Sequence, residues 1–332
     1  MKKYTIAIVG STKRTVLCAQ ELKKSDKFEI LWLLTPVPKP VGRKKVVTPN
    51  ELDIFGKENH ITSFYVQKKV DETLKDKLKD KLKDKKVDFL LVVDFGYIIP
   101  KWLLDLPTIV PLNIHPSHLP KWRGSSPGQY SILFNDKDSA ITLMKINDKF
   151  DQGPIVHQDF FEVDHNWSHE DYYSHAFKLI CENLDEKIIK SIDFSQNQPE
   201  ESPTPTAKIL KKEQTFVDWE ILKITTEFRK NIEDEKDIEV GKKVMSISPL
   251  LKTALKHNKS LALTIERASK AFYPWPNLWT IVNTQKGDKR MKLLDLKVEE
   301  DALGQTKLKI EKVQIEGKNP TSWNEIKNLI IE

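Results

Sequence analysis

Cysteine is scarce in this chain of 332 residues, and its hydrophobic runs are short. The two cysteines, Cys18 and Cys181, belong to no motif and lie far apart, so the sequence suggests neither a disulfide framework nor a cysteine-based zinc site. No apolar run approaches the roughly 20 residues that span a bilayer. The apolar run at 6–9 follows only two lysines and stops at Gly10, which argues against a signal peptide. We therefore expect a protein of the reducing cytoplasm, without a membrane partner.

Glycine is also scarce, and neither sign of charge dominates. The 11 glycines include Gly10, but Gly10-Ser11-Thr12 lacks the glycines of a dinucleotide-binding or phosphate-binding loop, so we expect no nucleotide cofactor. The 54 Lys and Arg against 48 Asp and Glu give a net charge of +6, which permits a polyanionic partner without requiring one. The length corresponds to about two domains of ordinary size.

Short apolar runs in the first half alternate with helix-forming stretches. The runs cover Tyr4–Gly10, Glu29–Leu34, Asp88–Val93 and Ile109–Ile114. This alternation predicts a parallel α/β sheet with helices on both faces, in which ligands bind beyond the carboxyl ends of the strands. In Lys68–Lys86, leucines at 74, 78 and 82 stand among balanced charges. That spacing favours a solvated amphipathic helix over a nucleic-acid patch.

The strongest break in composition is the polar, proline-rich stretch Ser195–Thr206, which we interpret as a domain linker. Beyond it, hydrophobic alternation returns in Leu278–Val282, Met291–Val298 and Leu308–Ile315. These runs predict a small antiparallel β-domain of the barrel type. We therefore divide the chain into domains at 1–204 and 205–332.

Asn113 and His115 carry the clearest chemistry. They lie two positions apart at the end of an apolar run, so on a strand both side chains project from one face. An amide donor beside an imidazole can stabilise an oxyanion and move a proton, which are the two needs of acyl transfer to an amine. Asp151 is a candidate third member, because a carboxylate can orient the imidazole. On pattern alone, an Asn-x-His followed by proline more often simply ends a strand, and Asp-Gln-Gly more often forms a turn.

The surrounding motif resembles the hydrolase-like formyltransferases that use 10-formyltetrahydrofolate, and among them the group that acts on methionyl-tRNA. The family pattern Asn-x-His-x-Ser-x-Leu-Pro-x-x-Arg-Gly is matched by Asn113, His115, Ser117, Leu119, Pro120, Arg123 and Gly124, and its Asp-x-Gly by Asp151, Gln152 and Gly153. The resemblance implies that Asn113, His115 and Asp151 are catalytic, with no metal. It also implies an N-terminal Rossmann-like parallel sheet followed by a smaller, OB-like β-barrel that binds tRNA.

The resemblance further implies a folate site formed by two stretches. Its residues would be Phe95, Gly96, Tyr97, Ser117, His118, Leu119 and Pro120. His118 departs from the leucine usual in the family, and it is either a second catalytic histidine or a packed substitution. Gly10-Ser11-Thr12 departs from the usual Gly-Thr-Pro, which puts the contacts of that loop in doubt.

A basic loop follows the second apolar run. Between Pro36 and Pro49 it carries Lys39, Arg43, Lys44 and Lys45 and no acid. By resemblance this loop approaches the acceptor end of the tRNA, although lysines also simply solvate surfaces. The pattern Phe272–Pro276 matches the tRNA-binding domain of the family, and the stretch near 222–265 is longer than expected, which indicates an insertion of open role. We expect a monomer that acts on initiator methionyl-tRNA.

Two other functions remain open on the sequence. A sugar or nucleotide-sugar N-formyltransferase would keep Asn113, His115 and Asp151 without needing the basic loop. A non-catalytic RNA-binding protein on a decayed enzyme scaffold would account for the altered loop at 10–12 and the insertion. The intact trio argues against this last reading.

Overall fold

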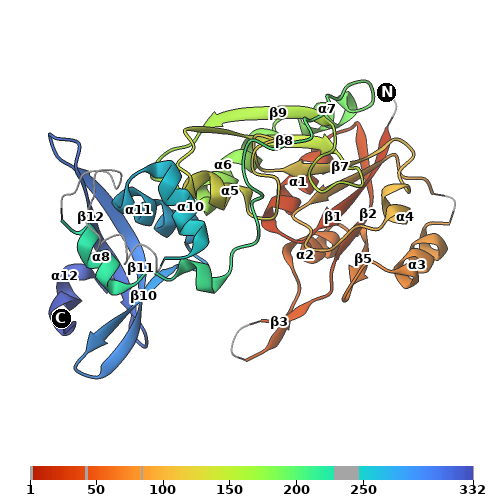
Figure 1. Cartoon of the computed structure of the whole chain (residues 1–332). Helices are drawn as coiled ribbons and strands as arrows, with labels where there is room; N and C mark the ends of the chain where they lie inside the picture. The colour runs from red at the N-terminus through yellow and green to blue at the C-terminus, as the bar shows by residue number, and fades with distance from the viewer. Residues whose placement is uncertain (1–2, 42–43, 84, 228–246, 332) are drawn as a thin grey trace. The chain divides into compact units, whose positions relative to one another are not determined.

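The computed structural model describes residues 3–41, 44–83, 85–227 and 247–331 (Figure 1). They form two compact units. Unit 1 comprises Met1–Gly124, Ala140–Phe161 and Ser174–Thr206, and unit 2 comprises Ser125–Ser139, Glu162–Tyr173 and Ala207–Glu332. Each unit is therefore discontinuous in sequence. In the described parts of the chain, no helix is both long and apolar enough to cross a bilayer.

A seven-stranded sheet forms the centre of the first half of the chain. Its strands are β1 (Tyr4–Gly10), β2 (Phe28–Pro36), β5 (Thr62–Val66), β6 (Phe89–Val93), β7 (Val110–His115), β8 (Asp138–Lys145) and β9 (Ile155–Glu162). The order is β5-β2-β1-β6-β7-β8-β9. The strands from β5 to β7 pair in parallel, and β8 runs antiparallel to β7. The predicted parallel α/β sheet is confirmed in these five strands.

Helices occupy connections between these strands or follow the last of them. They are α1 (Lys13–Lys24), α2 (Glu51–Glu58), α3 (Glu72–Leu82), α4 (Lys101–Leu104), α5 (Pro127–Leu133), α6 (His169–Cys181) and α7 (Leu184–Lys190). Of these, α1 to α5 lie in the connections between strands, and α6 and α7 follow β9. Every residue of β6 is buried, as expected for a strand covered on both faces. The predicted amphipathic helix is α3, whose leucines at 74, 78 and 82 are buried in the core of unit 1.

Gly10-Ser11-Thr12, which departs from the family motif, leads from β1 into α1, and the contacts of these residues explain the departure. A side chain at Gly10 would clash, since its Cβ would lie 2.2 Å from the carbonyl oxygen of Val93. Thr12 is the N-cap of α1 and forms a reciprocal capping box with Thr15. The Thr12 hydroxyl also donates to Asp94 Oδ2 at 2.9 Å, and Asp94 forms an ion pair with Arg14. This loop therefore caps a helix and ties it to the end of β6.

The two cysteines lie side by side in unit 1. Cys18 is buried in α1, Cys181 is the last residue of α6, and their Sγ atoms are 3.8 Å apart without a disulfide bond. Burial and the hydrogen bond between the thiols favour the neutral form, with the hydrogen bond from Cys181 the largest cause of the raised pKa of Cys18. Because the two cysteines lie far apart in the sequence, the sequence alone did not predict that they are neighbours.

Unit 2 is built around an antiparallel sheet. Its elements include η1 (Lys212–Thr215), α8 (Trp219–Thr225), α10 (Pro249–Asn258), α11 (Leu261–Phe272), β10 (Leu278–Thr284), β11 (Gly287–Glu300), β12 (Thr306–Ile315), β13 (Thr321–Ser322), α12 (Trp323–Ile326) and η3 (Lys327–Leu329). The sheet order is β10-β11-β12-β13, with antiparallel pairing throughout. The predicted antiparallel β-domain is thus confirmed, and among the described strands the sheet remains open.

The stretch predicted as an insertion, 222–265, is described only in part. Residues 228–246 lie outside the described residues. On either side of them stand α8 and the pair α10 and α11. In α11 the ion pair between Arg267 and Glu266 is buried, with both side chains at most 6% exposed.

Candidate active site

Strand β7 carries Asn113 and His115 at its carboxyl end. Because they are two positions apart on one strand, both side chains leave the same face of the sheet. His115 is buried, and its Nε2 atom lies 3.1 Å from the carbonyl oxygen of Trp122. The Asn113 side chain has no hydrogen-bond partner among the residues that the structure describes, so its amide is available to a ligand.

Asp151 lies next to His115, as the sequence predicted. Asp151 Oδ1 is 3.8 Å from His115 Nδ1, and the two side chains are 10% and 6% exposed. The other carboxylate oxygen accepts a hydrogen bond from the backbone N–H of Gly124 at 2.8 Å. Asp151 has a φ of +53°, in the left-handed region that non-glycine residues rarely adopt. The loop that carries this carboxylate is therefore strained and held by specific contacts.

Three consecutive residues, Trp122, Arg123 and Gly124, organise this group. The carbonyl of Trp122 faces His115, and the N–H of Gly124 binds Asp151. Between them, the Arg123 guanidinium donates to the carbonyls of Pro199 and Glu200 at 2.7 and 2.8 Å. Burial lowers the pKa of Arg123, and the nearby charge of Asp151 partly offsets this effect.

The proline-rich stretch that we interpreted as a linker is anchored to unit 1. Gln196 exchanges two backbone hydrogen bonds of 2.8 Å with Ile155. The Ser202 hydroxyl donates to the carbonyl of Pro120 at 2.8 Å, and Thr204 Oγ1 accepts from the backbone N–H of Trp122 at 2.7 Å. Its composition resembles that of a spacer, but these contacts hold it in place, and its last part, from Glu201 to Thr206, lines the site.

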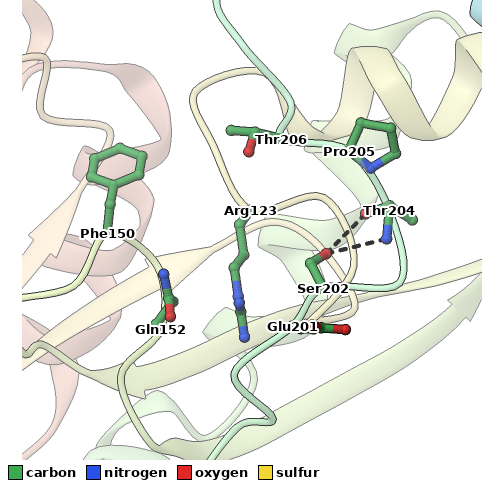
Figure 2. Close-up of a pocket in the computed structure, with 8 residues that line it drawn as sticks. All are labelled: Arg123, Phe150, Gln152, Glu201, Ser202, Thr204, Pro205 and Thr206. Atoms are coloured by element: carbon green, nitrogen blue, oxygen red, sulfur yellow. Dashed lines mark hydrogen bonds between the residues drawn. The ribbon is translucent and has the colours of Figure 1, made fainter.

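A cavity of about 510 Å³ is lined by Phe150 and Gln152, the two chain neighbours of Asp151 (Figure 2). It is lined by Arg123, Phe150, Gln152, Glu201, Ser202, Thr204, Pro205 and Thr206. Figure 2 shows the Arg123 side chain extending between Gln152 and Ser202. Phe150 is 69% exposed, so the residue directly before Asp151 presents an apolar ring to solvent.

The predicted folate residues follow two neighbouring strands. Phe95 and Tyr97, after β6, have ring centroids 5.2 Å apart and pack partly against the core of unit 1. Beyond β7, the Ser117 hydroxyl is buried and donates to the carbonyl of Lys121 at 2.7 Å, so it serves the loop itself. The ring of His118 meets the exposed Phe160 edge-on, with centroids 4.9 Å apart.

The remaining members of this predicted set shape the backbone. Gly96 is exposed, and nothing would contact a Cβ at that position. Leu119 is buried, and its carbonyl accepts from Gln158 Nε2 at 3.0 Å. The peptide bond between Leu119 and Pro120 is cis. These residues therefore form two loops at the carboxyl ends of β6 and β7, whose residues pair in parallel.

The predicted basic loop is a β-hairpin, which projects from the sheet at β3 in Figure 1. Its strands are β3 (Lys39–Val41) and β4 (Val46–Thr48). Lys39 Nζ lies 3.4 Å from the Tyr97 hydroxyl and 5.8 Å from the centre of its ring. Lys44 and Lys45 are exposed, whereas Arg43 lies outside the described residues.

Sequence reasoning missed one contributor to the site. Gln198 bonds to both Arg123 and the Asp151 loop. Nothing in its local sequence marked Gln198. No group of side chains suited to hold a metal ion occurs in the described ranges.

The fold and this site define a class of protein. In a mostly parallel α/β sheet, the carboxyl end of β7 carries an amide and an imidazole, and the loop between β8 and β9 adds a carboxylate. These groups suit an enzyme that transfers an acyl group. The family model described as "Formyl transferase" matches residues 2–182, and the chain belongs to this family.

Similar proteins extend the match beyond this segment. A methionyl-tRNA formyltransferase of Ehrlichia ruminantium is 32% identical over 206 residues, which cover 61% of this chain and 66% of that one. One of Buchnera aphidicola is 27% identical over 283 residues, covering 85% and 77%. Against several of these relatives the chain spans about half of their length.

Solved structures show the same fold. A sugar 3N-formyltransferase, crystallised in the presence of dTDP and 5-N-formyl-THF, superposes with a TM-score of 0.59. It is 16% identical, and the match covers 96% of this chain and all of that one. At this identity the likeness concerns the fold alone.

Proposed function

We propose that this protein transfers the formyl group of 10-formyltetrahydrofolate to the α-amine of initiator methionyl-tRNA. The observation that carries the proposal is the placement of Asn113 and His115 on one face of β7, with Asp151 3.8 Å from the imidazole. The names of the curated relatives support methionyl-tRNA as the acceptor.

In the proposed reaction, the amine nitrogen attacks the formyl carbon and negative charge develops on the formyl oxygen. The free amide of Asn113 donates a hydrogen bond to that oxygen. Collapse of the intermediate breaks the bond to N10 of the folate, which takes up a proton while the amine gives one up. His115 lies between two acceptors, the Trp122 carbonyl and Asp151. This arrangement suits a ring that carries two N–H groups and can donate one proton.

The donor would bind where the loops after β6 and β7 meet. In this proposal Phe95, Gly96 and Tyr97 hold one side of the folate, and the backbone of 117–120 holds the other. The Ser117 hydroxyl is already bonded to Lys121. Ser117 therefore contributes by fixing the loop, and His118 presents its ring beside Phe160.

The tRNA would be held by positive charge. Lys39, Arg43, Lys44 and Lys45 would contact its phosphates from the hairpin. The proposal keeps a catalytic domain at 1–204 and a tRNA-binding domain at 205–332, with an insertion near 222–265 and an OB-like barrel. The antiparallel order of β10 to β13 supports that barrel. We also propose that the protein is cytoplasmic, acts as a monomer and needs no metal.

The test is formyl transfer from labelled 10-formyltetrahydrofolate to three acceptors: initiator methionyl-tRNA, elongator methionyl-tRNA and an amino-sugar nucleotide. Formylation of the initiator alone is the expected result. Transfer only to the sugar would replace the proposal with a sugar N-formyltransferase. Binding of tRNA without transfer to any acceptor would indicate a scaffold that has lost catalysis.

The matched variant is Asn113→Ala. Loss of an oxyanion donor should lower kcat by about 10²–10³-fold with little change in KM for either substrate. An unchanged kcat would remove Asn113 from the proposed mechanism.

A further inference from the structure

We propose that Gln198 is a positioning residue that holds the Asp151 loop in its reactive geometry. This inference rests on the proposed formyl transfer. Gln198 lies in the stretch whose composition resembles a spacer, and the proposed mechanism gives it no role. It touches no reacting atom and would act through the carboxylate of Asp151.

The Asp151 loop needs such a support. The left-handed backbone of Asp151 is unfavourable for a residue with a side chain and persists only where the surroundings impose it. Two residues on, Gly153 lies so close to the neighbouring strand that a Cβ there would be 1.7 Å from the carbonyl oxygen of Lys145. The turn is thus both strained and tightly packed.

Gln198 binds the backbone of this turn on both sides of Gln152. Its Nε2 atom donates to the carbonyl of Asp151 at 3.1 Å and to the carbonyl of Gly153 at 2.8 Å. The two N–H groups of one amide therefore hold the two carbonyls that define the turn.

Arg123 fixes the orientation of that amide. Gln198 Oε1 accepts from Arg123 Nε at 3.2 Å and from Nη2 at 3.0 Å. Because a guanidinium only donates, the amide oxygen must face Arg123, and the amide N–H groups must then face the turn. Arg123 is 6% exposed, so water competes little for these bonds.

These contacts hold Asp151, the partner of His115, at two points. Asp151 is held through its carbonyl by Gln198 and through its carboxylate by the N–H of Gly124, next to Arg123. The Gly124 N–H therefore reports directly on the position of the carboxylate that faces His115.

Two variants separate the possible roles of Gln198. Gln198→Glu keeps an acceptor for Arg123 but removes both donors to the turn, whereas Gln198→Ala removes everything. The matched control is Gln196→Ala, because that side chain is exposed and its backbone bonds to Ile155 do not depend on it.

We expect both Gln198 variants to lower kcat about 10–100-fold with KM for folate and tRNA within twofold, because small misplacements of a reacting group cost this much. In both Gln198 variants, the exchange of the Gly124 amide hydrogen should accelerate about tenfold or more, while the thermal midpoint should stay near that of wild type. In the Gln196 variant, kcat and the Gly124 exchange rate should both stay near wild type. Wild-type kcat or unchanged Gly124 exchange in the Glu variant would overturn the inference. If the wild-type protein transfers no formyl group, the proposed function fails and the exchange rate alone decides the role of Gln198.

Discussion

Asp151 Oδ1 lies 3.8 Å from His115 Nδ1, longer than a hydrogen bond, although both side chains are almost closed to solvent. In substrate-free enzymes, catalytic hydrogen bonds are often long and tighten when the substrate binds. The two side chains already face each other at this distance, so the pair is placed before the substrates arrive.

Removing that charge should slow the chemical step. Asp151→Asn keeps an oxygen for the N–H of Gly124 but loses the negative charge facing His115. We expect kcat for methionyl-tRNA formylation to fall by about 10²–10⁴-fold, with KM little changed. Steady-state kinetics with both substrates varied will measure this. Asp148→Asn, an exposed acid in the same loop, is the control. Equal losses in both variants would contradict a specific role for Asp151.

The basic hairpin should control affinity for tRNA and leave the chemistry unchanged. Replacing Lys44 and Lys45 with Ala is expected to raise KM for tRNA, to leave KM for the folate unchanged and to flatten the salt dependence of binding. Each lost phosphate contact should reduce the slope of log K against log salt by about 0.7–0.9. The same double replacement at Lys77 and Lys81, which are exposed on α3, should change neither KM for tRNA nor the salt slope. An identical slope in the two double variants would remove the hairpin from the tRNA site.

An ion-pair cluster in unit 1 makes stability depend on pH. Burial opposes ionisation of Asp159, but hydrogen bonds from His157 at 2.9 Å and Lys187 at 2.7 Å outweigh it and lower the pKa of Asp159. A lowered pKa stabilises the folded state above the unfolded value of about 3.9 and loses that effect as pH falls through the folded value.

Asp159→Asn should therefore destabilise the protein by about 1–3 kcal/mol at neutral pH, and the difference from wild type should shrink between about pH 5 and pH 3. Thermal midpoints measured across this range will test it, with the exposed Asp193→Asn as reference. A difference that does not depend on pH would show that the charge of Asp159 is irrelevant.

The adjacent thiols should form a disulfide when a low-molecular-weight disulfide is added. Cys181, which is partly exposed, attacks the reagent and releases one thiol. Cys18 then attacks the mixed disulfide and releases the second, so two protons and two electrons leave the protein. Because the pKa of Cys18 is raised, the second step should accelerate as pH increases. Mass spectrometry will detect the loss of two hydrogens, and Cys18→Ser should stop at the mixed disulfide. Persistent mixed disulfide in wild type would contradict the prediction.

The sequence predicted those features that depend on local pattern. The buried strands β1 and β6 follow from unbroken apolar runs, the buried leucines of α3 from a spacing of four residues, and the shared face of Asn113 and His115 from a spacing of two. Contacts that form only in the folded chain have no such repeating pattern in the sequence. Gln198 lies in a polar, proline-rich stretch whose composition is typical of free spacers, although its side chain bonds to Arg123 and to the Asp151 loop.

The loop at Gly10 shows a second limit. Its departure from the family motif suggested lost contacts, whereas in the structure Thr12 caps α1 and meets Asp94. A resemblance predicts what relatives share, but replacement residues find partners that only the folded chain brings close.

The discontinuous makeup of the two units has a consequence for synthesis on the ribosome. Helix α5 packs against α11 within unit 2, yet the whole of 174–206, which belongs to unit 1, is made between them. The part of the α5 surface that α11 covers must therefore stay uncovered until α11 leaves the exit tunnel. Such a wait exposes hydrophobic surface to other chains, so the growing polypeptide is a natural client for chaperones that shield it until the second unit can close.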